Sequence, residues 1–237
     1  MNAEIELGVE WRYRRLLIIT GVGRSGTTAL ADLFREQPHT YVLYEPVIAK
    51  YLLSGWDELF RALLMEDYFI PLIRKVSRGT LDRRKEIVEY IERANPLFVL
   101  KTLESQFLIP KMREVFPGCL IIHAVRSGYD VIGSAVKRGW YTDQWLESGL
   151  IDYIIRHRNC KIPWYLPDSL HDLFVESDQI NRIALVWALL VKAGINEVTW
   201  RYGPIGSHEM TKHPKPVLAE QVFEMFADTM IESGYEL

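Results

Sequence analysis

The 237-residue chain is 49% hydrophobic and 25% charged, an ordinary globular composition that predicts one domain over residues 1–237. Its formal net charge of −3 excludes a global basic field, so neither nucleic acid nor a membrane is an expected partner. No apolar stretch approaches the roughly 20 residues of a membrane-spanning helix, and no secretory segment is visible, so we expect a cytoplasmic protein. The sequence does not indicate an oligomeric state.

Short apolar runs alternate with amphipathic segments along the chain. Strands are predicted at residues 16–20, 41–44, 97–100, 119–125 and 197–202. Helices are predicted at 27–36, over most of 50–94, and at 109–116, 129–138, 179–193 and 217–232. This alternation favours a parallel sheet covered on both sides by helices. Residues 140–177 are rich in aromatic side chains and are expected to form an irregular insertion beside the sheet.

The sharpest motif is a glycine-rich loop, Gly21-Val22-Gly23-Arg24-Ser25-Gly26-Thr27-Thr28, between the first strand and the first helix. Its glycines let backbone amides turn toward an anion, and the helix N-terminus adds a positive dipole end. The alternative is a glycine-rich turn without a ligand. We predict an anion site whose binding residues are Gly23, Arg24, Ser25, Gly26, Thr27 and Thr28.

The loop departs from the nucleoside-triphosphate pattern G-x-x-x-x-G-K-[ST], because Thr27 stands where the lysine belongs. The strand at 119–125 is followed by Arg126 and not by a magnesium-binding aspartate. Both features favour a site that binds its anion without a metal ion. Sulfuryl transfer is a reaction that needs no metal. The expected fold class is α/β, a P-loop-like three-layer sandwich with a central parallel sheet flanked by helices.

A second anion site is predicted at Arg126 and Ser134. In a doubly wound sheet, ligands collect outside the carboxyl ends of the strands, and Arg126 follows such an end. Ser134 lies about two helical turns further on and faces the same edge if its helix leans over the ligand. An arginine and a hydroxyl suit a phosphate, although pairing of Arg126 with a carboxylate is an equally common arrangement.

Together the two motifs resemble those of the sulfotransferases that use 3′-phosphoadenosine 5′-phosphosulfate (PAPS). Residues 24–28, Arg-Ser-Gly-Thr-Thr, are similar to the 5′-phosphosulfate loop of carbohydrate and tyrosylprotein sulfotransferases. Arg126 followed eight residues later by Ser134 resembles the family's 3′-phosphate motif. The resemblance runs from about Leu16 to the C-terminus, and the middle of the chain matches only in layout. It implies PAPS as co-substrate, adenosine 3′,5′-bisphosphate as product, and no metal.

Two segments depart from the family pattern. Residues 198–202 are similar to the start of its late Arg-Tyr-Glu-Asp-Leu segment, but Gly203 and Pro204 replace the acidic pair. We therefore assign this loop no catalytic role. Cytosolic sulfotransferases also use a Lys-Thr-His triplet with histidine as the base. The corresponding residues 101–103 read Lys-Thr-Leu, so the base must come from elsewhere.

An acceptor hydroxyl must lose its proton as its bond to sulfur forms, which requires a general base. Glu45, followed by Pro46 after the second predicted strand, is the candidate, and carbohydrate sulfotransferases place a glutamate and a proline there. Its alternative role is a surface or helix-capping glutamate. Lys101 ends the third strand and is expected either to steady developing charge or to pair with a carboxylate. His39 and Glu104 are reserve candidates for the base.

Aromatic residues gather in the predicted insertion, at Trp140, Tyr141, Trp145 and the pair Trp164-Tyr165. They suit a platform for a sugar face or an aromatic acceptor, or a cover for the helix after Arg126. The expected acceptor carries a hydroxyl and is a small molecule, a sugar, a phenol, a peptide tyrosine or a secondary metabolite, and the sequence does not choose among these.

The expected reaction is in-line transfer of a sulfuryl group from PAPS to the acceptor, with Glu45, Arg24 and Lys101 as catalytic residues. A small-molecule or nucleotide kinase on the same fold is the first rival, and it requires ATP and magnesium. A nucleotide-binding relic or scaffold without turnover is the second rival.

Overall fold

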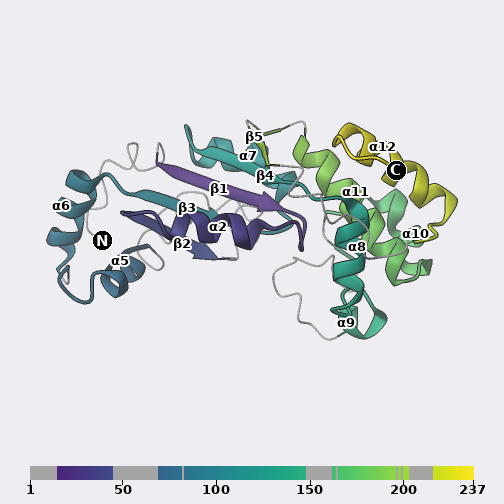
Figure 1. The fold of residues 1–237 in the computed structure, drawn as a ribbon, viewed down its shortest axis with the longest axis horizontal. Coiled ribbons are helices and arrows are strands. Elements are labelled where there is room, and N and C mark those ends of the chain that lie inside the picture. Colours follow the sequence, from purple (N-terminus) through teal and green to yellow (C-terminus); the bar gives the residue numbers. More distant parts are fainter. Residues whose placement is uncertain are drawn as a thin grey trace. The chain divides into compact units, whose positions relative to one another are not determined.

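The computed structural model describes residues 15–44, 69–81, 83–147, 162, 163, 165–195, 197, 198, 200–202 and 216–237 (Figure 1). The strands are β1 Leu16–Gly21, β2 Thr40–Tyr44, β3 Leu97–Lys101, β4 Leu120–Ala124 and β5 Trp200–Tyr202. The helices are α2 Thr27–Arg35, α5 Ile70–Val76, α6 Arg84–Ala94, α7 Ile109–Val115, α8 Gly128–Val136, α9 Asp143–Glu147, α10 His171–Glu176, α11 Gln179–Ile195 and α12 Glu220–Glu232. Two short 3₁₀ helices, η2 and η3, span Gln106–Leu108 and Asp168–Leu170.

The fold is α/β, with a sheet of strand order β2-β3-β1-β4-β5 flanked by helices. Four of its strands form an all-parallel central sheet, as the alternation in the sequence predicts. Leu16 pairs with Phe98 and Thr40 with Leu97, which sets the register of β1 and β2 on β3. All six residues of β1 are buried, because the strand is covered on both faces.

The chain divides into two compact units. The first contains residues up to 19, 28–102 and 108–122, and the second contains 20–27, 103–107 and 123–237. In the first unit, Ile18, Val99 and Leu100 are fully buried on the sheet. Phe69 packs on Phe98, with ring centroids 4.6 Å apart. This apolar core fixes β1, β2 and β3 as neighbours (Figure 1).

In the second unit, α8, α11 and α12 pack around one hydrophobic core (Figure 1). Helix α11 is buried over most of its length, which agrees with its nearly continuous apolar sequence. Trp187 on α11 is fully buried and lies 5.0 Å from the ring of Phe226 on α12. His123 is also fully buried, and Gly194 leaves the room that its ring occupies. Trp187 and His123 are thus part of this core.

The structure differs from the sequence prediction between residues 140 and 177. Helices α9 and α10 and the 3₁₀ helix η3 lie in this segment, so its described part is not irregular. Phe174 on α10 and Leu146 on α9 are buried, and this tertiary burial stabilises helices too short to be recognised from periodicity. Residues 148–161 and 164 lie outside the described residues. Across the part of the chain that is described, no helix is long and apolar enough to cross a membrane.

Candidate anion-binding site

The glycine-rich loop makes a tight turn between β1 and α2. Arg24 and Gly26 have positive φ angles of 75° and 85°, with Ser25 between them. The N–H of Ser25 donates to the carbonyl of Val22 at 3.1 Å and closes the turn. Left-handed residues alternating in this way occur in the backbone nests that bind anions. A non-glycine residue held in this conformation is strained, and such strain concentrates at functional sites.

Packing explains two of the loop's glycines. A Cβ atom on Gly21 would lie 2.7 Å from the carbonyl oxygen of Ala124 and from Cγ2 of Thr27. A Cβ atom on Gly23 would lie 2.5 Å from Cζ3 of Trp140. Both distances are shorter than real contacts, so any side chain here would displace a neighbour. Trp140 therefore lies directly against the loop.

The hydroxyls of the loop differ in their surroundings. Ser25 is fully buried, and its Oγ has no hydrogen-bond partner among the described residues. Leaving a buried hydroxyl unsatisfied costs about 1–3 kcal/mol. Thr27 is also buried, whereas Thr28 is exposed. Ser25 and Thr27 are thus inward-facing parts of the turn.

The structure brings Arg24, Arg126 and Ser134 together. Nε of Arg24 donates to Oγ of Ser134 at 2.9 Å. Nη1 of Arg126 lies 3.5 Å from the carbonyl oxygen of Arg24, and its Nε lies 3.3 Å from Oδ2 of Asp130. Loop and helix α8 are thus joined by side chains from both sequence motifs. The carboxylate pairing considered for Arg126 is present as well, and it leaves the guanidinium within reach of the loop.

A third arginine belongs to this cluster. The pKa of the Arg24 guanidinium is lowered, first by burial and then by the positive charges of Arg138 and Arg126. Sequence reasoning missed Arg138, which follows Ser134 by four residues and lies in the turn after α8 ends at Val136. The three guanidiniums create a local positive field in a chain whose net charge is −3. This field favours a multiply charged anion.

Buried side chains bind the backbone at Arg126 and at the residue before it. Nε1 of Trp187 donates to the carbonyl of Arg126 at 3.1 Å. The hydroxyl of Tyr235 donates to the carbonyl of Val125 at 3.0 Å, and burial raises the pKa of this tyrosine to about 12. A Cβ atom on Gly128 would meet the ring of Phe226 at 2.3 Å, so the helix begins in close contact with α12. These contacts fix where α8 starts.

Glu104 lies beside the start of the loop, and two buried phenols bind its side chain. Its N–H donates to the carbonyl of Gly21 at 3.2 Å, and its own φ is 53°. The hydroxyls of Tyr141 and Tyr165 donate to its two carboxylate oxygens at 2.9 and 3.0 Å. Burial, and then the charge of Glu104, raise the pKa of both phenols well above the ordinary value. Sequence reasoning saw these tyrosines as aromatics and missed this role.

The remaining residues predicted from the sequence either lie outside the described residues or belong to the first unit. Glu45 and Trp164 lie outside the described residues, as do the side chains of residues 201–204. Lys101 ends β3 and is almost completely buried. Nδ1 of His39 lies 2.9 Å from the Tyr90 hydroxyl. Of the reserve base candidates, Glu104 has a described hydrogen bond to the loop, from its N–H to the carbonyl of Gly21.

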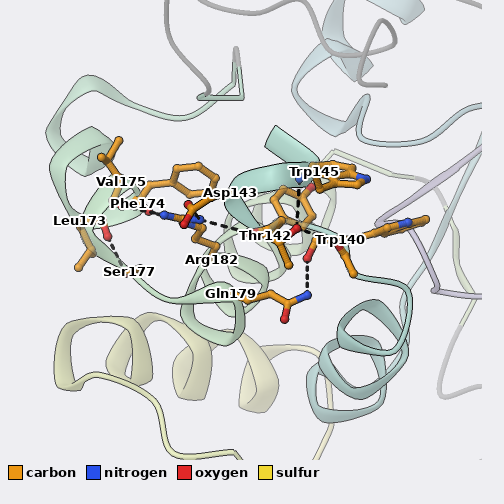
Figure 2. A network of polar contacts seen from close by, with 12 residues as sticks. Trp140, Thr142, Asp143, Trp145, Leu173, Phe174, Val175, Ser177, Gln179 and Arg182 are labelled. Carbon is orange, nitrogen blue, oxygen red and sulfur yellow. Dashed lines mark hydrogen bonds and ion pairs between the residues drawn. The ribbon is translucent and has the colours of Figure 1, made fainter. Parts of the chain in front are cut away.

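A network of polar contacts binds the backbone around Trp140 (Figure 2). Arg182 on α11 is buried and donates to the carbonyls of Phe174, Val175 and Tyr141 at 2.9, 2.8 and 3.3 Å. Nε2 of Gln179 donates to the carbonyl of Trp140 at 2.8 Å. The backbone at Trp140 and Tyr141 is therefore bound to α11 by hydrogen bonds. These bonds stabilise the position in which the Trp140 indole contacts Gly23.

No protein-family model matches the chain, and no curated protein matches it. In the described part of the chain, no group of three or more His, Cys, Asp or Glu residues is arranged to hold a metal ion. The candidate site is therefore defined by the chain's own residues.

We predict that Arg182→Met destabilises the protein by about 3 kcal/mol, because three backbone carbonyls, two of them in buried contacts, lose their donor. Asp143→Asn is the matched control, since Asp143 is the acidic partner of Arg182 at 2.7 Å but is 81% exposed. Its loss is expected to cost less than about 1 kcal/mol. Urea unfolding of both variants measures the difference. Equal destabilisation would show that the ion pair, and not the carbonyl contacts, holds the segment.

We predict that Gly23→Ala lowers the free energy of unfolding by about 1–3 kcal/mol through overpacking against Trp140. The same substitution in a Trp140→Ala background is expected to cost less, because the clashing ring is gone. Thermal or urea unfolding of the two single variants and the double variant gives the coupling energy. Additive effects would contradict the close approach of the indole to the loop.

Proposed function

We propose that this protein is a sulfotransferase that moves a sulfuryl group from PAPS to an acceptor hydroxyl. The observation that carries the proposal is the meeting of Arg24, Arg126 and Ser134 at the glycine-rich loop. Two motifs that lie 102 residues apart, measured from Arg24 to Arg126, contribute to one cluster of anion-binding groups. A nucleotide with phosphate groups at both its 3′ and 5′ positions requires such a combination.

The finer fold assignment belongs to the same proposal. A buried parallel strand, a glycine-rich turn and a helix that begins at Thr27 form a P-loop-like unit in a three-layer α/β sandwich. In such a unit, loop amides and the helix N-terminus bind a phosphate group. Here no lysine follows Gly26, so the loop suits the 5′-phosphosulfate of PAPS better than the triphosphate of ATP.

The residues present fit PAPS in charge and in hydrogen bonding. Ser25 Oγ, fully buried and without a partner among the described residues, is a donor that a bound oxygen atom would satisfy. The guanidiniums of Arg24, Arg126 and Arg138 supply positive charge, and Asp130 offsets part of it at Arg126. Arginine forks bind phosphate oxygens with two parallel hydrogen bonds.

In the proposed reaction, PAPS supplies the sulfuryl group and leaves as adenosine 3′,5′-bisphosphate. The acceptor oxygen bonds to sulfur while the bond between sulfur and the 5′-phosphate oxygen breaks. Loop amides, with Ser25 and Thr27, orient the 5′ end, and Arg126 and Ser134 bind the 3′-phosphate. Glu45 takes the acceptor proton, and Lys101 steadies the charge on the leaving oxygen. Both of these roles come from the sequence and the family resemblance.

Calorimetric titration with adenosine 3′,5′-bisphosphate in the absence of magnesium tests the binding step. We expect binding by the wild type and a loss of about 10- to 100-fold in Arg126→Ala, the scale of a charge-assisted hydrogen bond. Arg93→Ala, which removes an exposed arginine on α6, is the control and is expected to leave affinity unchanged.

Transfer is then measured with PAPS labelled in its sulfuryl group and a panel of sugars, phenols and other alcohols. Labelled product that depends on Arg126 supports the proposal. Magnesium-dependent preference for ATP would indicate a kinase instead. Nucleotide binding without transfer to any acceptor would indicate a binding protein that has no turnover.

A further inference from the structure

Arg24 is part of the loop that the sequence assigns to the 5′-phosphosulfate, but its side chain reaches the other motif. We infer that Arg24 binds the 3′-phosphate of the nucleotide, together with Ser134 and Arg126, and thereby selects nucleotides phosphorylated at the 3′ position. The inference rests on the proposed function and reassigns one of its residues. It makes Arg24 a residue for specificity, where the sequence predicts a role at the transferred group.

The direction of the Arg24 side chain carries this inference. Its Nε donates to Ser134 Oγ at 2.9 Å, so the guanidinium lies at the hydroxyl that the second motif offers to the 3′-phosphate. The guanidinium of Arg126 also lies near Arg24, with its Nη1 3.5 Å from the Arg24 carbonyl oxygen. Arg24 has a left-handed backbone conformation, with φ at 75°, and its side chain extends from the loop to Ser134 on α8.

The charges around Arg24 point to a phosphate monoester. Arg138 and Arg126 are both close enough to lower the pKa of the Arg24 guanidinium, after burial. The positive charges of Arg24, Arg126 and Arg138 repel one another, and an anion bound among them would relieve that repulsion. Near neutral pH a phosphate monoester carries between one and two negative charges and has three acceptor oxygens. That chemistry matches two or three arginine forks and a serine hydroxyl better than a sulfuryl group, whose oxygens share a single charge.

The rest of the loop serves the 5′ end without Arg24. Thr27 begins α2, and both Thr27 and Ser25 are buried in the turn. Backbone amides at a helix N-terminus bind an anion without help from a charged side chain. Removal of the Arg24 side chain is therefore expected to spare binding of the 5′ group.

Two ligands that differ at the 3′ position test the inference. Full-length wild type and Arg24→Gly are titrated with adenosine 3′,5′-bisphosphate and with adenosine 5′-phosphosulfate, which lacks the 3′-phosphate. We expect Arg24→Gly to weaken bisphosphate binding by about 10- to 100-fold and adenosine 5′-phosphosulfate binding by less than about 3-fold. Glycine is the chosen replacement because it adopts a φ of 75° without strain.

A matched control and a second variant sharpen the test. Arg78→Gly makes the same substitution at an exposed arginine that also has a positive φ, of 53°, and it is expected to change neither affinity. Ser134→Ala is expected to weaken bisphosphate binding, and its effect and that of Arg24→Gly should not add, because both act on one phosphate. Arg24→Lys, which keeps the charge but loses the fork, should lie between wild type and Arg24→Gly. Circular dichroism checks that each variant is folded.

The outcomes separate this inference from the proposed function. If Arg24→Gly weakens the binding of both ligands equally, or the binding of adenosine 5′-phosphosulfate alone, Arg24 acts at the 5′ end. The inference is then wrong, while the sulfotransferase proposal stands. Additive effects of Arg24→Gly and Ser134→Ala on bisphosphate affinity would likewise contradict the inference that both residues bind one phosphate. If the wild type binds neither ligand, the proposed function fails and the inference fails with it.

Discussion

The hydrogen bond from Arg24 to Ser134 is the contact on which the candidate site depends. It joins residues 110 positions apart and ties the loop that follows β1 to helix α8. Without it, the loop and the helix would each present a weak anion site of a common kind. With it, the guanidinium of Arg24 lies at the Ser134 hydroxyl, near the positive charges of Arg126 and Arg138. The positive φ of Arg24 is the backbone strain that accompanies this arrangement.

The surroundings hold both partners of that bond in place before any ligand arrives. Trp187 and Tyr235 fix the backbone next to Arg126 by donating to consecutive carbonyls. On the loop side, Trp140 fills the space in which Gly23 has no side chain, and Arg182 anchors the segment that carries this tryptophan. A site built on such a support does not need to order itself on binding, so more of the interaction energy appears as affinity.

Electrostatics gives the site its chemical character. The chain as a whole is slightly acidic, so the attraction for an anion comes from three arginines placed together and not from net charge. Close by in the same unit, Glu104 contributes a carboxylate bound by Tyr141 and Tyr165, whose phenols stay protonated because burial raises their pKa. Arg126 is paired with the carboxylate of Asp130, whereas Glu104 accepts hydrogen bonds from two neutral phenols.

The sequence alone determined the α/β class, the order of most strands and helices, and the loop, because continuous apolar runs and glycine spacing are local signals. It also indicated Arg126 and Ser134, since the ends of parallel strands meet at one edge of a sheet. Only the tertiary structure decided that Arg24 bonds to Ser134 and that Arg138 joins the cluster. It alone showed that two tyrosines bind Glu104 and that short helices form between residues 140 and 177. The hydrogen bonds from Tyr141 to Glu104 and from Arg24 to Ser134 join residues 37 and 110 positions apart, and periodicity carries no information about such contacts.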